Sequence, residues 1–192
     1  MKKHKTWVKI KAPKVFNEVD LGETPVYENK DVIGRTVEQS VNHLLGTRAK
    51  IGQNVRFKVV NVKGDEAETQ IESFFLSRIF AMQIPRRSSK VELVKDLKTK
   101  DNVKIRVKMF AITYGRASTT QKKVIRKMMD TQISKIILDM NFEPLILSII
   151  SGELQKGIAK SVRKIYPVRE VRVYKVERLK IRRKARGKED QG

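Results

Sequence analysis

The sequence predicts an α+β protein with a mainly antiparallel sheet, and three patterns in the order of its residues carry this prediction. The first half of the chain alternates apolar and polar residues with the period of β-strands, two later segments repeat apolar residues at helical spacing, and the end returns to alternation. With 192 residues, of which 40% are hydrophobic, the chain can bury one sizeable core. We therefore expect a single domain over residues 1–192.

The first strand pair is predicted over residues 55–75. Apolar residues from Val55 to Val62 alternate with basic ones, and the alternation slips by one near Val59-Val60, which is typical of a β-bulge. The turn residues Lys63-Gly64-Asp65-Glu66 follow and predict a hairpin. On the returning strand, acidic or amide residues form the wet face, opposite the basic face of the first strand, so these acids are interpreted as structural partners rather than catalytic groups. The expected core-facing residues are Ala67, Thr69, Ile71, Ser73 and Phe75, and the wet ones are Glu66, Glu68, Gln70 and Glu72.

A second hairpin is predicted from residues 91–97 and 103–113, joined through residues 99–102. Alternate residues of the second strand are apolar and should face the core, whereas three cations should lie on its other side. Cations in a row repel one another unless an anion covers them. The apolar set is Val103, Ile105, Val107 and Met109, and the cations are Lys104, Arg106 and Lys108.

A long helix is predicted from about residue 120 to residue 140, with Ser118 or Thr119 available to cap its free amides. Its apolar residues recur at helical spacing and form a wide stripe, while three basic residues fall on the other side. The stripe consists of Val124, Ile125, Met128, Met129, Ile133, Ile136, Ile137 and Met140, and the basic residues are Lys123, Arg126 and Lys127.

A second helix is expected over residues 153–166, because proline at position 167 disfavours helical geometry in the residue before it. It would turn Leu154, Ile158, Val162 and Ile165 inward and Lys156, Lys160, Arg163 and Lys164 outward. A long strand over residues 168–181 follows. The folded body is thus expected over residues 15–181, between a basic extended arm at 1–14 and a basic flexible tail at 182–192 that cannot bury enough apolar surface to order itself.

The charge of the chain calls for a polyanionic partner. Its 43 Lys and Arg against 21 Asp and Glu give a formal charge of +22. The excess is larger after residue 101, where 23 basic residues face 8 acidic ones, than before it, where 20 face 13. A solvated, lysine-rich surface of the thermophilic kind is the competing interpretation, but such surfaces usually balance Lys with Glu.

The residues needed for most enzyme chemistry are scarce. The chain has no cysteine and two histidines, which disfavours disulfides, thiolate metal sites and His-based catalytic triads. The segment 152–157 lacks the spacing and the Lys-Ser/Thr ending of a P-loop. We therefore expect no enzyme activity, no cofactor and no metal. No run of residues approaches the length of a membrane span or a signal core, so a cytoplasmic protein without a membrane partner is expected.

The candidate nucleic-acid-binding residues lie at the two ends of the chain, on the cationic strand face and on the cationic faces of the helices. Aromatic residues are only 6% of the chain, which favours recognition of backbone and shape over base stacking. Trp7 could stack on a base or anchor the arm to the core, and Arg116 could hold a phosphate beside a helix start or lie in a capped turn. The full set is Lys2, Lys3, Lys5, Trp7, Lys9, Lys11, Lys14, Lys104, Arg106, Lys108, Arg116, Lys122, Lys123, Arg126, Lys127, Lys160, Arg163, Lys164, Arg178, Lys180, Arg182, Arg183, Lys184 and Arg186.

Several segments, in their order and spacing, resemble one known family. These are residues 7–17 (WVKIKAPKVFN), 34–38 (GRTVE) and 124–129 (VIRKMM), and then Ile165-Tyr166-Pro167 followed by Val171, Val173, Lys175-Val176 and Leu179-Lys180. Together they resemble the archaeal and eukaryotic small-subunit ribosomal protein family eS-one, also called S-three-A-e, in its shorter archaeal form. The resemblance covers nearly the whole chain.

The resemblance implies a β-barrel-like, mainly antiparallel sheet packed by two to four helices. It also implies a structural constituent of the small (30S) ribosomal subunit in the cytoplasm, which supports translation and has no enzyme activity or cofactor. The protein would bind the 3′ region of small-subunit ribosomal RNA on the platform, beside neighbouring platform proteins and near the mRNA exit, with direct contact to mRNA left open. The alternatives are a non-specific architectural nucleic-acid-binding protein, with duplex DNA as its partner, and a metal-dependent nuclease using Asp65 or Glu66.

Overall fold

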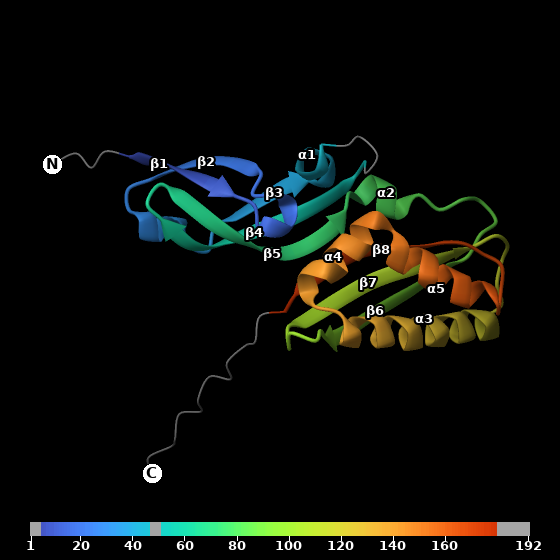
Figure 1. The fold of residues 1–192 in the computed structure, drawn as a ribbon. Helices are drawn as coiled ribbons and strands as arrows, with labels where there is room; N and C mark the ends of the chain where they lie inside the picture. Colours follow the sequence, from blue (N-terminus) through green and yellow to red (C-terminus); the bar gives the residue numbers. More distant parts are fainter. Residues whose placement is uncertain (1–4, 47–50, 180–192) are drawn as a thin grey trace, which may run out of the picture.

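The fold is an α+β arrangement in which one mixed, mainly antiparallel sheet is covered on part of one face by helices (Figure 1). The computed structural model describes residues 5–46 and 51–179, except for the side chains of residues 29, 81 and 82. The strands are β1 (Thr6–Lys11), β2 (Asp20–Val26), β3 (Thr36–Ser40), β4 (Gln53–Lys63), β5 (Glu66–Leu76), β6 (Lys90–Lys98), β7 (Lys104–Thr113) and β8 (Val168–Arg178). The α-helices are α1 (Val41–Leu45), α2 (Arg78–Met82), α3 (Thr119–Asp139), α4 (Phe142–Ser151) and α5 (Glu153–Arg163), and short 3-10 turns occupy Lys14–Phe16 and Asn29–Val32.

The strand order shows that the sheet is open. The hydrogen-bonded path runs β2-β1-β5-β8-β7-β6, and β4 and β3 extend from β5 off this path. Every pairing is antiparallel except that of β1 with β5. The predicted α+β class is confirmed. The sheet resembles a barrel only loosely, because it does not close on itself.

Strand β5 joins the two parts of the sheet. Its beginning, Glu66 to Glu68, pairs in parallel with Lys9 to Lys11 of β1, and its end, Ser73 to Phe75, pairs antiparallel with β8. The strand therefore changes partner along one edge while β4 follows it along the other. A break in β5 would separate the part formed by β1 to β4 from the part formed by β6 to β8.

The predicted hairpin of β4 and β5 is confirmed, including its bulge. Val59 pairs with Thr69 and Asn61 with Glu68, so Val60 is left without a partner and is 53% exposed. The hairpin also contains a second irregularity, which was not predicted. Its register passes from Arg56 opposite Ser73 to Phe57 opposite Ile71, so β5 has one extra residue there. Ser73 is buried as predicted, but the alternation reverses after it, so the prediction that Phe75 faces the core is wrong: Phe74 is fully buried instead and Phe75 is half-buried.

The second predicted hairpin, β6 with β7, is also confirmed. Ile105, Val107 and Met109 are buried in the core, and Val103 is half-buried against it. The alternation of β7 therefore places Lys104, Arg106 and Lys108 on the opposite face, as predicted.

The predicted long helix is present as α3, and Ser118 caps it. The Ser118 side chain accepts a hydrogen bond from the Gln121 amide, and the Gln121 side chain accepts one from the Ser118 amide, which forms a capping box. Val124 was predicted in the apolar stripe but is 44% exposed, because it lies about 100° around the helix from its buried neighbour Ile125. The buried stripe is Ile125, Met129, Ile133 and Ile137.

Two further corrections concern the other helices. Helix α5 ends at Arg163, earlier than the predicted residue 166, because the amides of Ile165 and Tyr166 turn back to the Val162 carbonyl oxygen. Helix α4 was not predicted. It is a short helix of ten residues, and its buried residues Phe142, Leu145, Ile146, Ile149 and Ile150 recur at helical spacing.

The ends of the expected body also differ from the prediction. The arm expected at residues 1–14 contains strand β1, which is paired on both edges and buries Val8 and Ile10, so the folded body begins before residue 15. Strand β8 ends at Arg178, and the last residues of the predicted strand, 180 and 181, lie outside the described residues, as does the tail at 182–192. Within the described part of the chain, no helix is long and apolar enough to cross a membrane.

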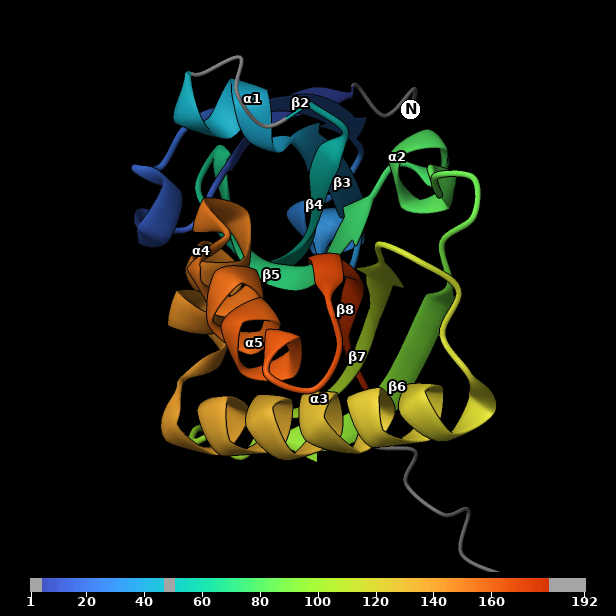
Figure 2. The same ribbon diagram turned by 90° about the vertical axis from the view of Figure 1, so that its right-hand side faces the viewer.

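The helices cover one face of strands β6, β7 and β8, and no long helix of the described residues lies on the other face. Helix α3 packs on β6, α5 packs on β8, and α4 packs against α5. Figure 2 shows α3, α4 and α5 together on one side of these strands, with the short α2 near the edge of the other side. The second face is called the open face below.

Candidate nucleic-acid interface

The start of α3, the end of α5 and the loop before β6 are tied together at one end of the molecule (Figure 1, right). The Tyr166 hydroxyl donates to the Arg116 carbonyl oxygen at 3.2 Å, and the Tyr114 amide donates to the Pro167 carbonyl oxygen at 3.1 Å. Ser89 and Thr113 exchange backbone and side-chain hydrogen bonds of 2.9 to 3.1 Å. These bonds fix three segments that are distant in the sequence beside one another.

The segments joined in this way are rich in cations. We call this surface the basic end, and none of its cations forms an ion pair with a carboxylate among the described residues. All but the half-buried Lys122 are exposed. Since like charges repel one another, the surface favours an anionic partner that spans it. The basic end consists of Arg86, Arg87, Arg116, Lys122, Lys123, Lys160, Lys164 and Arg169.

The charges of α3 run against its dipole. The partial positive charge of a helix lies at its N-terminus, where acidic residues stabilise it and cations do not. Helix α3 has no acidic residue in its first turn and no basic residue in its last, and Lys122 and Lys123 follow immediately after the first turn. This arrangement costs stability in the isolated protein, and an anion bound over the start of α3 would remove the cost.

The structure shows the turn that contains Arg116 capped and facing solvent. Arg116 is exposed beside the start of α3, but the capping box already satisfies the Ser118 and Gln121 amides. The turn is therefore capped, the Arg116 guanidinium is exposed to solvent, and its contact with a phosphate stays a prediction.

The cations of β7 have partners within the protein. Arg106 forms two hydrogen bonds with Asp96, from Nε to Oδ1 at 2.6 Å and from Nη2 to Oδ2 at 2.8 Å. This bidentate contact holds the pKa of Asp96 below its ordinary value. Lys108 lies 3.7 Å from Glu177, while Lys104 is exposed. The anions that relieve the repulsion along this strand are thus partly the protein's own carboxylates.

The N-terminal candidates also divide into exposed cations and cations with a partner in the protein. Lys9 and Lys14 are exposed, whereas Lys11 forms an ion pair of 2.6 Å with Glu66, and Lys5 lies 5.4 Å from the centre of the Tyr27 ring. The Trp7 side chain is 61% exposed, so the interpretation of Trp7 as an anchor to the core is wrong.

The remaining described candidates lie on the helices and at the end of β8. Lys127 is exposed, Arg126 donates to the Glu92 carbonyl oxygen at 2.9 Å, and Arg163 donates to the carbonyl oxygens of Val168 and Arg169 and so fixes the start of β8. The other predicted residues, Lys2, Lys3, Lys180, Arg182, Arg183, Lys184 and Arg186, lie outside the described residues.

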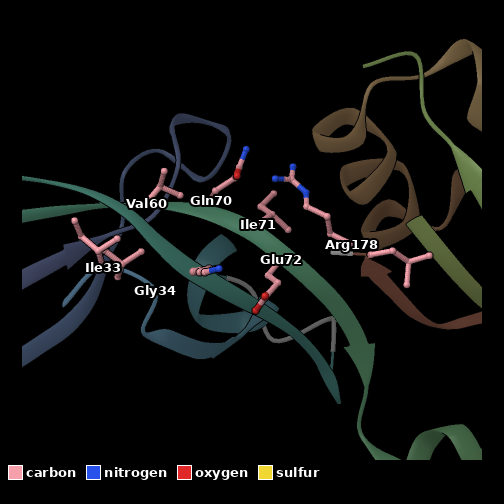
Figure 3. A pocket seen from close by; sticks show the side chains of 10 residues that line it. Ile33, Gly34, Val60, Gln70, Ile71, Glu72 and Arg178 are labelled. Carbon is pink, nitrogen blue, oxygen red and sulfur yellow. The ribbon is translucent and has the colours of Figure 1, made fainter. Parts of the chain in front are cut away.

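Arg178 is half-buried and packs against the start of α4. Its guanidinium lies 4.9 Å from the centre of the Phe142 ring, and burial lowers its pKa from the ordinary value. Figure 3 shows it at one end of a hollow of about 370 Å³, next to Ile71 and Gln70 of β5 and opposite Ile33 and Val60. Its position indicates that it stabilises the junction between β8 and α4.

Sequence reasoning missed three cations of the basic end: Arg86, Arg87 and Arg169. The pair Arg86-Arg87 lies between Pro85 and Ser88, and such a dibasic step in a turn was a usable signal. Arg169 carried no such signal, because it is a single basic residue within the alternating pattern of β8. In the described ranges, no group of three or more His, Asp or Glu side chains is placed to hold a metal ion.

Comparison with known proteins gives a consistent result. A family model described as the Ribosomal S3Ae family matches residues 2–182. The small ribosomal subunit protein eS1 of Saccharolobus islandicus strain L.S.2.15 is 37% identical over 180 residues, which cover 93% of this chain and 86% of the relative. The eS1 proteins of Desulfurococcus amylolyticus and Sulfurisphaera tokodaii are 34% and 36% identical, over 93% of this chain and over 84% and 93% of their own lengths. The chain therefore belongs to the Ribosomal S3Ae family.

Proposed function

We propose that the chain is a structural protein of the small ribosomal subunit in the cytoplasm and that it holds ribosomal RNA through its basic end. The relatives named above are small-subunit ribosomal proteins. The observation that carries the proposal is the basic end itself, where cations from three segments gather against the dipole of α3 and have no carboxylate partner in the part of the chain that the structure describes. Ribosomal RNA supplies a dense and irregular array of phosphates that matches such a surface.

The proposal places the protein on the platform of the subunit, against the 3′ region of the RNA and near the mRNA exit. Neighbouring platform proteins would be its protein partners. The protein acts by shape and charge, without a catalytic step. Regions away from the basic end, such as strands β3, β4 and β5 with their ion pairs, would then hold the fold rather than the RNA.

Sedimentation of subunits assembled with tagged variants tests the docking surface. The double variant Lys123→Glu and Lys164→Glu should be lost from the small-subunit fraction. The matched control Lys30→Glu and Lys98→Glu makes the same charge change at exposed residues elsewhere and should stay in that fraction. Full retention of the first variant would contradict docking through the basic end, and absence of the wild-type protein would contradict the ribosomal role.

The absence of cysteine from the chain allows a direct test of location. A single cysteine introduced as Arg169→Cys can carry an iron chelate that cleaves nearby RNA through hydroxyl radicals. Cleavage should fall in the 3′ region of small-subunit RNA, whereas the probe at Lys30→Cys should cut elsewhere or not at all. Cleavage confined to the 5′ region would contradict the platform assignment.

A competition assay separates the proposal from an architectural DNA-binding role. At about 0.15 M salt, small-subunit RNA should displace a labelled RNA far better than duplex DNA of equal phosphate content, because the DNA lacks the irregular shape. Preference for the DNA would support the alternative.

A further inference from the structure

The open face of the sheet carries an aromatic hollow that the basic end does not include. The hollow has a volume of about 640 Å³ and is lined by residues of β4, β5, β6, β7, β8 and the start of α2. Phe75, Phe110 and Tyr174 supply three aromatic rings to its walls. Phe110 is fully buried, yet it does not belong to the continuous apolar core beneath the helices. The rings therefore form a separate apolar surface on the face that faces away from α3 and α5.

A bulge positions the Tyr174 ring. Lys108 of β7 pairs with Lys175 and Met109 pairs with Val173, so Tyr174 is the extra residue of β8. Its ring lies 5.7 Å from the Phe110 ring, centre to centre, at a tilt of 38°. Bulges re-aim side chains and are common beside binding sites. A strand without the bulge would not hold these two rings together at the mouth of the hollow.

The polar groups of the hollow are suited to an anionic ligand that has a flat ring. Arg78 is exposed at the start of α2, and Lys90 lies over the Phe110 ring at 4.7 Å. Glu92 is the acidic residue of the lining, and its carboxylate is paired with Lys90. Arg56 lies over the Phe75 ring at 5.7 Å, on the β4 side of the hollow. Arg56 is itself paired with Glu38, and Lys90 with Glu92, so Arg78 is the cation of these surroundings that has no carboxylate partner among the described residues.

Two polar side chains of the hollow have hydrogen-bonding capacity to spare. The side-chain amide of Asn54 and the hydroxyl of Tyr174 have no hydrogen-bond partner within the described part of the chain. Burial raises the pKa of Tyr174, so its hydroxyl remains a donor at neutral pH. An amide offers both a donor and an acceptor, which is what the edge of a nucleobase requires.

We propose that this hollow binds one unpaired RNA base, which stacks on the rings of Tyr174 and Phe75, presents its edge to Asn54 and leaves its phosphate near Arg78. Proteins recognise single-stranded RNA in this way, by stacking splayed-out bases on aromatic side chains and bonding their edges. The inference rests on the proposed RNA-binding function and adds a second contact of a different kind. The basic end would recognise phosphates, and the hollow would recognise a base.

Binding of the full-length chain to a short single-stranded RNA and to a duplex of equal phosphate content, followed by fluorescence anisotropy, tests the proposal. Tyr174→Leu should weaken single-strand binding by about tenfold, as expected for the loss of one stacked base, and leave duplex binding unchanged. Tyr174→Phe keeps the ring and should retain most of the affinity. Tyr27→Leu, at an exposed tyrosine outside the hollow, is the matched control and should bind both RNAs as wild type does.

The outcomes distinguish this proposal from the proposed function. If the wild-type chain binds neither RNA, the RNA-binding function itself is wrong. If it binds both, and Tyr174→Leu still binds the single strand fully, only the base site is wrong. Full RNA affinity together with poor incorporation of Tyr174→Leu into the subunit would indicate a protein side chain in the hollow and would also overturn the proposal. If Tyr174→Leu lowers the melting temperature, its weaker binding could come from unfolding, and Asn54→Ala then tests the base site. Unchanged single-strand affinity of Asn54→Ala would contradict the site.

Discussion

The Tyr166 hydroxyl donates a hydrogen bond of 3.2 Å to the carbonyl oxygen of Arg116 and so ties the end of α5 to the start of α3. Replacing Tyr166 by Phe should lower the free energy of unfolding by about 0.5–1 kcal/mol, since one hydrogen bond is removed. Urea denaturation measures the change. Tyr114→Phe is the matched control, because Tyr114 is 63% exposed and its hydroxyl bonds to no described residue, so its stability should not change. Equal decreases in the two variants would show that the bond to Arg116 has no special role.

Two glycines should respond to alanine in opposite directions. Gly52 has a φ of +77°, and a Cβ atom there would lie 2.1 Å from a ring carbon of Phe80, so Gly52→Ala should cost more than about 1 kcal/mol of stability. Gly157 lies within α5 with open space around it, and Gly157→Ala should add about 0.5–1 kcal/mol. Thermal unfolding of both variants measures the difference. A gain in stability for Gly52→Ala would contradict the close approach of Phe80.

The pair of Asp96 and Arg106 should make stability depend on pH in the acid range. The bidentate hydrogen bond from Arg106 holds the pKa of Asp96 below its ordinary value of 3.8. A carboxylate with a lowered folded-state pKa stabilises the fold above the unfolded-state pKa, and this contribution disappears as the pH falls through the folded-state pKa.

The free energies of unfolding of wild type and Asp96→Asn should therefore differ near neutral pH and converge in strong acid. Urea titrations from about pH 6 to about pH 2 test this. Asp65→Asn, in the exposed turn between β4 and β5, removes a carboxylate without an ion pair in the described residues and serves as the control. A difference between wild type and Asp96→Asn that is the same at every pH would rule out the ion pair as its source.

The basic end should be visible in the salt dependence of RNA binding. Removing one lysine–phosphate interaction reduces the slope of log affinity against log salt by about 0.9 on a duplex, so Lys123→Gln with Lys164→Gln should flatten it by about 1.8. Lys30→Gln with Lys98→Gln should leave the slope unchanged. A lower affinity with the original slope would mean that the two basic-end lysines act on the fold rather than on phosphates.

The local signals in the sequence predicted the hairpins and the long helix well. The slip near Val59-Val60 and the turn at Gly64-Asp65 predicted a bulged hairpin, and Ser118 predicted the start of α3, because these features depend on neighbouring residues alone. Strand β1 was missed as a strand because its place in the sheet depends on β5, which lies far along the chain. Phe75 was assigned to the wrong face because a one-residue shift in register reverses a whole face of a strand.

The candidate site was predicted less completely, because charge alone does not reveal which cations have partners. Arg106 and Arg116 look alike in the sequence, yet the first is paired with Asp96 and the second is exposed at the basic end. The aromatic hollow could not be predicted either. The separate positions of Phe75, Phe110 and Tyr174 give no sign that a bulge in β8 and the turn into α2 bring them together.

The partner change along β5 has a consequence for the order of events on the translating ribosome that makes the protein. The end of β5 pairs with residues of β8 that are synthesised roughly 100 residues later. Until then its edge offers unpaired amides and carbonyls, which can pair with another chain, and distant pairings of this kind form slowly. The nascent chain can complete β1 to β4 early, but it reaches its native sheet only when almost all of its residues have left the exit tunnel. Premature termination before β8 would therefore release a chain whose unpaired β5 edge can associate with other chains, rather than a smaller folded domain.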